Sequence, residues 1–367
     1  FEFQRLHGMG DGLYNNLVRD EGYKCRIYAP VGGHSDLLAY LVRRLLENGA
    51  NSSFVHQLAD ESVSPEDLLA DPVRKVENVD LSRHPSIPLP KDVFEPARSN
   101  SIGIDLEDSL ILRETEAAIR EYKMPPAPAE TSAAEVESMI AKAQAVAGEW
   151  SRTDVEKRAV ALERLADRMQ EEMMPLIALC VHEAKKTYGD SVDEVREALD
   201  FCRYYARRAR EDFATIELPS VTGETNELTL EGRGVFGCIA PWNFPLAIFT
   251  GQMVAALVAG NTVIAKPAPQ TPRIAKRAVE LAHECGIPKD VLHFACGGAE
   301  PGQALVSDRR VTGIAFTGST ATAKGIQRTI AEDDERPIVP LIAETGGLNA
   351  MIVDSTALPE QVTRDVV

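Results

Sequence analysis

Three polar side chains of types that do chemistry stand directly after apolar runs of the sequence. Asn243 follows the run 235–240, Lys266 follows 262–265 and Glu344 follows 338–343. An amide can donate a hydrogen bond to a developing negative charge, and a carboxylate can take a proton from water. Asn is also a frequent turn residue, and a carboxylate at a strand end is often only solvated. Residue type alone therefore leaves a catalytic and a structural interpretation open.

The elements around Asn243 and Lys266 have the order of a parallel α/β fold. Residues 235–240 are typical of a buried strand, a turn follows, and Pro245 begins a helix that is apolar on all faces until Gly260. Lys266 then ends a second buried strand. In a parallel sheet, ligands bind beyond the carboxyl ends of the strands, where the amide and the amine would both lie. The helix is shorter than the ~20 apolar residues that span a bilayer, which excludes a membrane helix here.

Three further apolar runs extend the expected sheet, at 291–295, 311–316 and 338–343. Ser319 follows the second of these runs and stands at the start of a helix. A strand-like run at 350–354 and the start of another helix close the sequence. We therefore expect an α/β fold with a parallel sheet.

The segment before this unit is predicted to be helical. Ser132-Ala-Ala-Glu135 and Thr153-Asp-Val-Glu156 have the pattern of capping boxes, which predicts two helix starts. Apolar residues at helical spacing mark one buried face on each helix, and on a third helix around 192–206. These stripes indicate core rather than a cofactor site.

The composition argues against several classes of partner. The 367 residues carry a formal net charge of −17, whereas nucleic acids and anionic membrane surfaces attract basic faces. Hydrophobic residues make up 44%, enough for a sizeable core in two or three domains. The six cysteines show no CxxC and no regular spacing, so neither a disulfide framework nor a metal site is predicted. A reducing cytoplasm fits this cysteine usage best.

Four motifs in a fixed order carry a family resemblance: PWNFP (241–245), AKPAPQTP (265–272), FTGST (316–320) and ETGGLNA (344–350). Together they resemble the aldehyde dehydrogenase superfamily, and they are far more specific than a single glycine-rich loop. The resemblance implies a Rossmann-like sheet, NAD as cofactor, and a cysteine thiolate that attacks an aldehyde. Hydride then passes to NAD, and water hydrolyses the thioester.

The resemblance also implies roles for the residues in these motifs. Asn243 would stabilise the oxyanion, and Glu344 would be the general base for the hydrolytic water, with a pKa raised by burial. Lys266 would bind the adenosine ribose, Ser319 the pyrophosphate at a helix N-terminus, and Trp242 would lie near the nicotinamide. The other positions expected to contact the cofactor are Ala240, Pro241, Ala268, Thr317, Gly318 and Gly346.

Two positions depart from the family pattern. Pro269 stands where many members have a Glu that shares the ribose hydroxyls, which weakens the case for NAD over NADP. Cys296 stands in a loop near the cofactor where glycine is usual, but the family's nucleophile follows ETGG, so we expect Cys296 to be a small loop residue. Cys238 is expected to be structural. The resemblance would put the nucleophile a few tens of residues beyond Glu344, past Val367.

The first 60 residues form a unit of their own. Two strand–helix pairs are expected, and the second helix runs from Ser35 to Asn48, where Gly49 closes it. Its leucine-rich stripe faces one side, and the other side carries Tyr40, Arg43, Arg44 and Glu47. A solvated charged face is the ordinary explanation of such a pattern.

The segments EFQRLHGMG, CRIYAPVG and LLAYLVRRLLENGANSSFV resemble the last two β/α units of the proline dehydrogenase barrel, a TIM-type barrel. This resemblance implies that Arg43 and Arg44 hold the carboxylate of proline, for which a planar guanidinium is suited. It also implies that Tyr28 and Tyr40 line the same pocket and that Glu47 and Phe54 lie near FAD. Two of eight units cannot enclose a flavin, so this part is expected to be inactive as it stands.

A proline-rich connector, with one helix expected at 105–122, joins the segment that resembles proline dehydrogenase to the segment that resembles aldehyde dehydrogenase. The sequence therefore predicts three parts: 1–60, 61–125 and 126–367. Together the two resemblances imply a fusion protein that oxidises proline with FAD and then oxidises the resulting glutamate γ-semialdehyde with NAD. Neither end resembles a natural terminus, so the sequence is expected to be a piece of a longer protein. Two alternatives remain: a non-catalytic dinucleotide-binding fragment, and an aldehyde dehydrogenase of other specificity. The resemblance further implies a small-molecule substrate and a homo-oligomer in the full-length protein, with 226–231 as a strand of the oligomerising hairpin.

Overall fold

The computed structural model describes residues 2–7, 10–49 and 86–366, together with positions 60, 62–64, 67, 69, 71, 73 and 77. The chain divides into two compact units, Phe1–Ile87 and Pro88–Val367.

The first unit consists of two strand–helix pairs, as the sequence predicts. They are β1 (Glu2–Leu6), α1 (Asp11–Arg19), β2 (Lys24–Tyr28) and α2 (His34–Gly49). The two strands pair in parallel, with Leu6 opposite Tyr28 at their carboxyl ends. The Phe3 ring lies edge-on to Tyr14 and Tyr23, at centroid distances of 6.3 and 5.4 Å. This order confirms the expected β/α units.

The second unit begins with a short 3-10 turn at Pro90–Asp92 and a series of helices. They are α6 (Ser109–Glu121), α7 (Ala133–Ser151), α8 (Val155–Glu171), α9 (Met173–Ala184) and α10 (Tyr188–Asp212). The first of them matches the helix expected in the connector, and Asp108 caps it by accepting from the Leu110 N–H at 2.8 Å.

One of the two predicted capping boxes is present and the other is wrong. Ser132 and Glu135 exchange both bonds at the start of α7. At α8 the cap is Asp154, which accepts from the Glu156 N–H at 3.0 Å. The Thr153 hydroxyl instead donates to the Glu149 carbonyl at 3.1 Å. Because only three residues separate the two helices, Thr153 still serves the end of α7 and cannot start α8.

A five-stranded parallel sheet follows, which confirms the expected fold class. Its strands are β5 (Val235–Ile239), β6 (Thr262–Lys266), β7 (Leu292–Phe294), β8 (Val311–Thr317) and β9 (Leu341–Glu344), in the order β7-β6-β5-β8-β9. The connecting helices are α11 (Ala247–Val258), α12 (Pro272–Glu284), α13 (Ala299–Ser307) and α14 (Thr320–Ala331). The register places Ile239 beside Lys266 and Thr317 beside Glu344 at the carboxyl edge.

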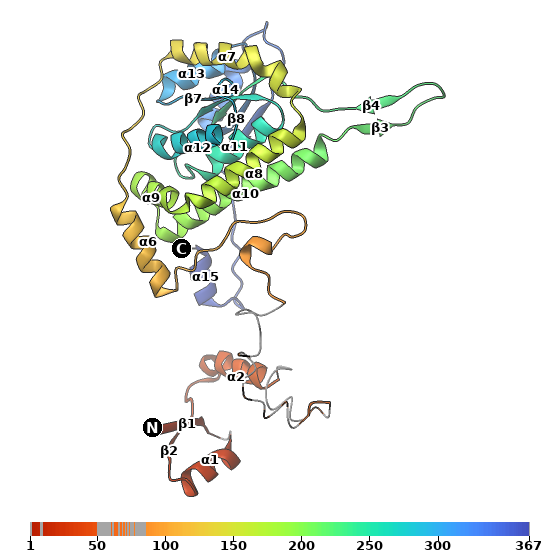
Figure 1. The fold of residues 1–367 in the computed structure, drawn as a ribbon. Coiled ribbons are helices and arrows are strands. Elements are labelled where there is room, and N and C mark those ends of the chain that lie inside the picture. Colours follow the sequence, from red (N-terminus) through yellow and green to blue (C-terminus); the bar gives the residue numbers. More distant parts are fainter. Residues whose placement is uncertain are drawn as a thin grey trace. The chain divides into compact units, whose positions relative to one another are not determined.

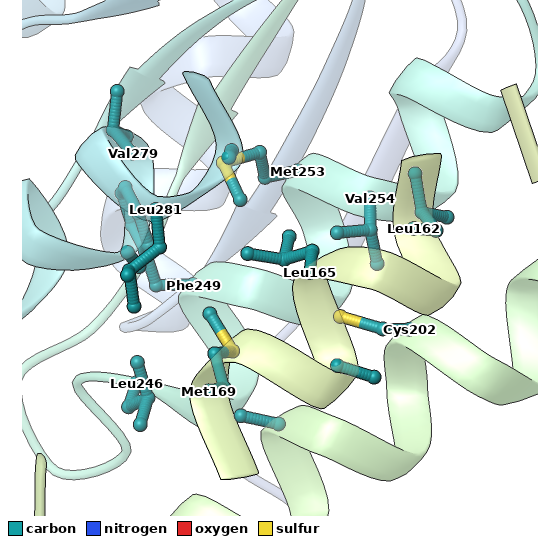
Figure 2. Packing of buried hydrophobic residues seen from close by; sticks show 14 of the residues in the cluster. Leu162, Leu165, Met169, Cys202, Leu246, Phe249, Met253, Val254, Val279 and Leu281 are labelled. Carbon is teal, nitrogen blue, oxygen red and sulfur yellow. The ribbon is translucent and has the colours of Figure 1, made fainter. Parts of the chain in front are cut away.

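The sheet lies between two layers of helices (Figure 1). Helices α8 to α12 pack with one face of the strands in the larger core cluster, and α7, α13 and α14 pack with the other face in the second cluster. Successive side chains of β6 point to opposite faces of the sheet, so Val263 and Ala265 belong to the first cluster and Ile264 belongs to the second. Figure 2 shows the centre of the first cluster, where Leu165 of α8, Cys202 of α10 and Met253 of α11 gather. This apolar packing fixes the strand ends that carry the polar side chains.

Strands β3 (Ile216–Leu218) and β4 (Asn226–Leu228) pair antiparallel in a hairpin that projects from the end of α10 (Figure 1). The hairpin was expected from the sequence. Its apolar side chains Ile216, Leu218, Leu228 and Leu230 are exposed.

Two predicted element starts and one predicted strand are wrong. Helix α11 begins at Ala247 rather than Pro245, because the carboxylate of Glu194 accepts the N–H groups of Leu246 and Ala247. The fifth strand begins at Leu341 rather than Ile338, since Pro340 has no N–H to donate. The run 350–354 is not a strand, and no described strand pairs with it. It is followed by α15 (Pro359–Val366), the further helix that the sequence predicts.

Candidate active site

A cleft of about 690 Å³ opens at the carboxyl edge of the sheet, over the ends of β5, β8 and β9. Eleven of its twelve lining residues come from three motifs singled out in the sequence; they are Pro241, Trp242, Asn243, Phe316, Thr317, Gly318, Ser319, Thr320, Glu344, Thr345 and Gly346. The structure therefore brings together the amide, the carboxylate and the helix start that lie far apart in the sequence.

The loop after β8 is fixed by contacts on both sides. The Gln252 side-chain amide of α11 donates to the Thr317 hydroxyl at 2.8 Å, and the Gly318 N–H donates to the Glu344 carbonyl at 3.0 Å. A Cβ at Gly318 would lie 2.7 Å from Cζ of Phe316, so a side chain there would displace the ring. Ser319 caps α14 by accepting from the Thr322 N–H at 3.2 Å. Close approach of backbone to a ligand is therefore possible at this loop.

Glu344 lies in the cleft but is exposed. The burial that we expected around a general base is thus wrong for the described residues. The reason is local: β9 is an edge strand of this sheet, and its residues from Ile342 onward are exposed. The carboxylate can receive water directly at this position.

Lys266 is at the same edge of the sheet but does not line the cleft. Only 5% of the residue is exposed, and its ammonium donates to the Pro267 carbonyl at 3.4 Å. Burial lowers the pKa of Lys266 from its ordinary value. Ala240, whose N–H donates to the Lys266 carbonyl at 3.0 Å, is buried, and Ala268 is half-buried. These three expected cofactor contacts therefore lie beside the cleft rather than in its wall.

The helix N-termini at this edge differ in what they can bind. Glu194 accepts two backbone N–H groups at the start of α11, and Glu183 accepts those of Arg273 and Ile274 at the start of α12, both at 3.0 Å. A buried carboxylate already occupies the positive end of each of these helices. At α14 the cap is a neutral hydroxyl at the rim of the cleft. Of the three helices, α14 is the one whose N-terminus fits a pyrophosphate.

None of the six cysteines lines the cleft. Cys238 is buried within β5, where desolvation raises the pKa of the thiol to about 12, in agreement with a structural role. Cys296 lies in the loop after β7 and is 4% exposed. Burial raises the pKa of Cys296, which disfavours the reactive thiolate. No group of metal-ligating side chains occurs among the described residues.

In the first unit, Tyr28 ends β2 and is exposed, whereas Tyr40 and Arg43 belong to α2 and are half-buried and exposed, respectively. The side chains of Arg44 and Glu47, and all of Phe54, lie outside the described residues.

No helix in the described part of the chain has the length and apolar character needed to cross a membrane.

Sequence reasoning missed some of the cleft. Phe316, Thr320 and Thr322 also line it, although FTGST already contains two of them. Lys186 and Glu194 contact the turn that contains Asn243, but no sequence motif indicates this. Their partners in the turn are more than fifty residues away in the chain.

Comparisons with known proteins agree with this architecture. Residues 124–367 match the sequence pattern of the aldehyde dehydrogenase family, and residues 1–57 match that of proline dehydrogenase. Over 410 aligned positions the chain is 46% identical to the bifunctional protein PutA of Klebsiella aerogenes, with 100% of this chain and 30% of the relative covered. It is 39% identical over 212 positions to the 1-pyrroline-5-carboxylate dehydrogenase 2 of Bacillus subtilis, covering 57% of this chain and 41% of the relative.

A crystal structure of a bifunctional proline utilization A (PutA) protein superposes with a TM-score of 0.88 at 51% identity, over 100% of this chain and 38% of that one. The chain thus spans about a third of the length of these bifunctional relatives.

Proposed function

Since the chain belongs to the aldehyde dehydrogenase family, we propose that residues 126–367 are the nucleotide-binding part of an NAD-dependent L-glutamate γ-semialdehyde dehydrogenase of proline catabolism. The observation that carries the proposal is the cleft in which Asn243, Glu344 and the N-terminus of α14 meet. The substrate follows from the relatives, one named a 1-pyrroline-5-carboxylate dehydrogenase and another a bifunctional PutA. The aldehyde is the open form of 1-pyrroline-5-carboxylate.

The residues of the cleft would divide the work among them. The Asn243 amide would donate to the oxyanion, where one such donor typically contributes about 10²–10³ in kcat. The Glu344 carboxylate would take the proton of the hydrolytic water. Ser319 and the first turn of α14 would hold the pyrophosphate, Lys266 the ribose, and Trp242 the nicotinamide end. Bound NAD would supply the hydride acceptor.

For residues 1–60 we propose the C-terminal part of a proline dehydrogenase barrel that uses FAD, joined through a linker at 61–125. Arg43 and Arg44 would hold the carboxylate of proline, and Tyr28 and Tyr40 would line that pocket. Tyr28 lies at the carboxyl end of its strand, where barrels of this type bind substrate. We further propose that the protein acts on small molecules in the cytoplasm.

The test of the dinucleotide site is NADH binding by the chain. Exposed Trp242 should be quenched by NADH, whereas Trp150 is buried against the α11 helix end. Ser319→Asp keeps an N-cap acceptor but adds a negative charge beside the pyrophosphate, so we expect affinity to fall about tenfold. Ser319→Thr, which keeps the hydroxyl, is the matched control. Absence of quenching in the wild-type chain would contradict the site.

A measurement of activity on the same chain distinguishes an enzyme from a module that only binds the dinucleotide. Because no cysteine lines the cleft, residues 1–367 are expected to bind NAD and yet to form no NADH from glutamate γ-semialdehyde. Absorbance of NADH would be followed over time. NADH formation by this chain would show that a nucleophile is present after all.

The projecting hairpin is proposed to join copies of the protein. Its exposed apolar residues would be covered by a second copy. Leu218→Glu together with Leu228→Glu is therefore expected to lower the mass measured by light scattering to that of one chain. A mass equal to that of the wild-type chain would exclude the hairpin as the interface.

A further inference from the structure

Glu194 of α10 is a fully buried carboxylate with a complete set of partners. Its side chain has no exposed surface. One oxygen accepts the N–H groups of Leu246 and Ala247, at 2.9 and 2.8 Å, and the other accepts the Lys186 ammonium at 2.6 Å. A buried carboxylate is stable only with such compensation.

Lys186 extends this arrangement to the turn that carries the cleft amide. Its ammonium also donates to the Asn243 carbonyl at 3.1 Å and lies 4.3 Å from the centre of the Phe244 ring. The side chain is 12% exposed. The ion pair therefore contacts the turn on both sides, at Asn243 and at the first N–H groups of α11.

The Asn243 side chain makes no hydrogen bond to the described residues, so only its backbone fixes where the amide lies. We propose that Lys186 and Glu194 are positioning residues, which hold the 242–246 turn so that Asn243 and Trp242 face the cleft. The role of Asn243 as oxyanion donor rests on the proposed function, whereas the positioning of the turn does not. An oxyanion donor contributes only when it is held in place before the reaction.

The chain offers a matched control for the simpler explanation that Glu194 only caps a helix. Glu183 is also buried, at 2% side-chain exposure, and accepts two N–H groups at the start of α12 together with the Arg273 guanidinium. Its hydrogen-bond partners Arg273 and Ile274 do not line the cleft. If capping were the whole role, the two glutamates would behave alike.

The test uses the full chain with its two tryptophans replaced by fluorotryptophan. Fluorine NMR then gives one resonance for Trp242, next to Asn243, and one for Trp150, which reports on the core. Lys186→Met removes the ammonium with little change in volume, Lys186→Arg keeps a cation, Glu194→Gln removes the charge, and Glu183→Gln is the control. NADH titrations accompany each spectrum.

We expect Lys186→Met and Glu194→Gln to shift and broaden the Trp242 resonance and to leave the Trp150 resonance unchanged. The affinity for NADH should fall about fivefold in both variants. Lys186→Arg should restore most of the signal, and Glu183→Gln should leave Trp242 in place. An unchanged Trp242 resonance in Lys186→Met, or an equal change in Glu183→Gln, would overturn the proposal. If Glu194→Gln also collapses the Trp150 resonance, the two Lys186 variants decide. If wild-type chain fails to bind NADH, the proposed function falls, while the fluorine spectra still decide the positioning role.

Discussion

Replacing Arg158 with methionine is expected to destabilise the chain by about 3 kcal/mol, because the change leaves several buried carbonyls without a donor. Arg158 is 3% exposed and donates to the carbonyls of Val258 at 2.9 Å and Ser151 at 3.0 Å, and also to those of Trp150 and Thr153. Burial lowers the pKa of its guanidinium, so these acceptors compensate a desolvated charge. The side chain thus joins the end of α7 to the end of α11, directly before β6.

The measurement is the free energy of unfolding in urea, followed by the fluorescence of Trp150. Arg164→Met on the same helix is the control, since Arg164 is exposed and should change stability by no more than about 0.5 kcal/mol. A loss below about 1 kcal/mol for Arg158→Met would mean that water replaces the guanidinium at these carbonyls.

Local sequence rules predict the sheet and most of its helices but not the exact element starts. The apolar runs of β5, β6 and β8 and the cap at Ser132 follow from composition and spacing alone. The errors occur where a distant partner decides. Asp154 competes with Thr153 for one helix start, and Glu194, more than fifty residues away, determines where α11 begins.

The same limit applies to the cleft. Motifs locate Asn243, Ser319 and Glu344, because each stands at the carboxyl end of a strand or within a few residues after it. They cannot give burial, which depends on what packs over the strand: Lys266 in the interior of the sheet is buried, whereas Glu344 on the edge strand is exposed. Glu183 and Glu194 are ordinary helix carboxylates in the sequence, and only their tertiary contacts show that they occupy the ends of α11 and α12.

Replacing Lys266 with methionine is expected to weaken NADH binding without lowering the stability of the chain. The ammonium is buried without an ion-pair partner in the described part of the chain, and its stem packs against α13, where a Cβ on Gly302 would lie 3.4 Å from Cε of Lys266. Methionine has a similar volume but no charge, so it removes a desolvated ammonium without leaving a large cavity. The free energy of unfolding should therefore be unchanged or slightly higher. Loss of a charge-assisted hydrogen bond to the ribose should weaken the binding of NADH by about 1.5–3 kcal/mol, which lowers the affinity about 10- to 100-fold.

Two measurements on the same variant separate a dinucleotide contact from a purely structural lysine. NADH affinity is measured by Trp242 quenching and stability by urea unfolding, with Lys276→Met, an exposed residue of α12 that pairs with Glu280 at 3.8 Å, as the control. Because burial lowers the pKa of Lys266, the wild-type affinity should also fall with rising pH before the ordinary lysine pKa of about 10.5 is reached, and the methionine variant should lack this dependence. An affinity equal to that of the wild-type chain would show that Lys266 does not reach the dinucleotide, and a stability loss without a binding loss would make it a structural residue of the sheet edge.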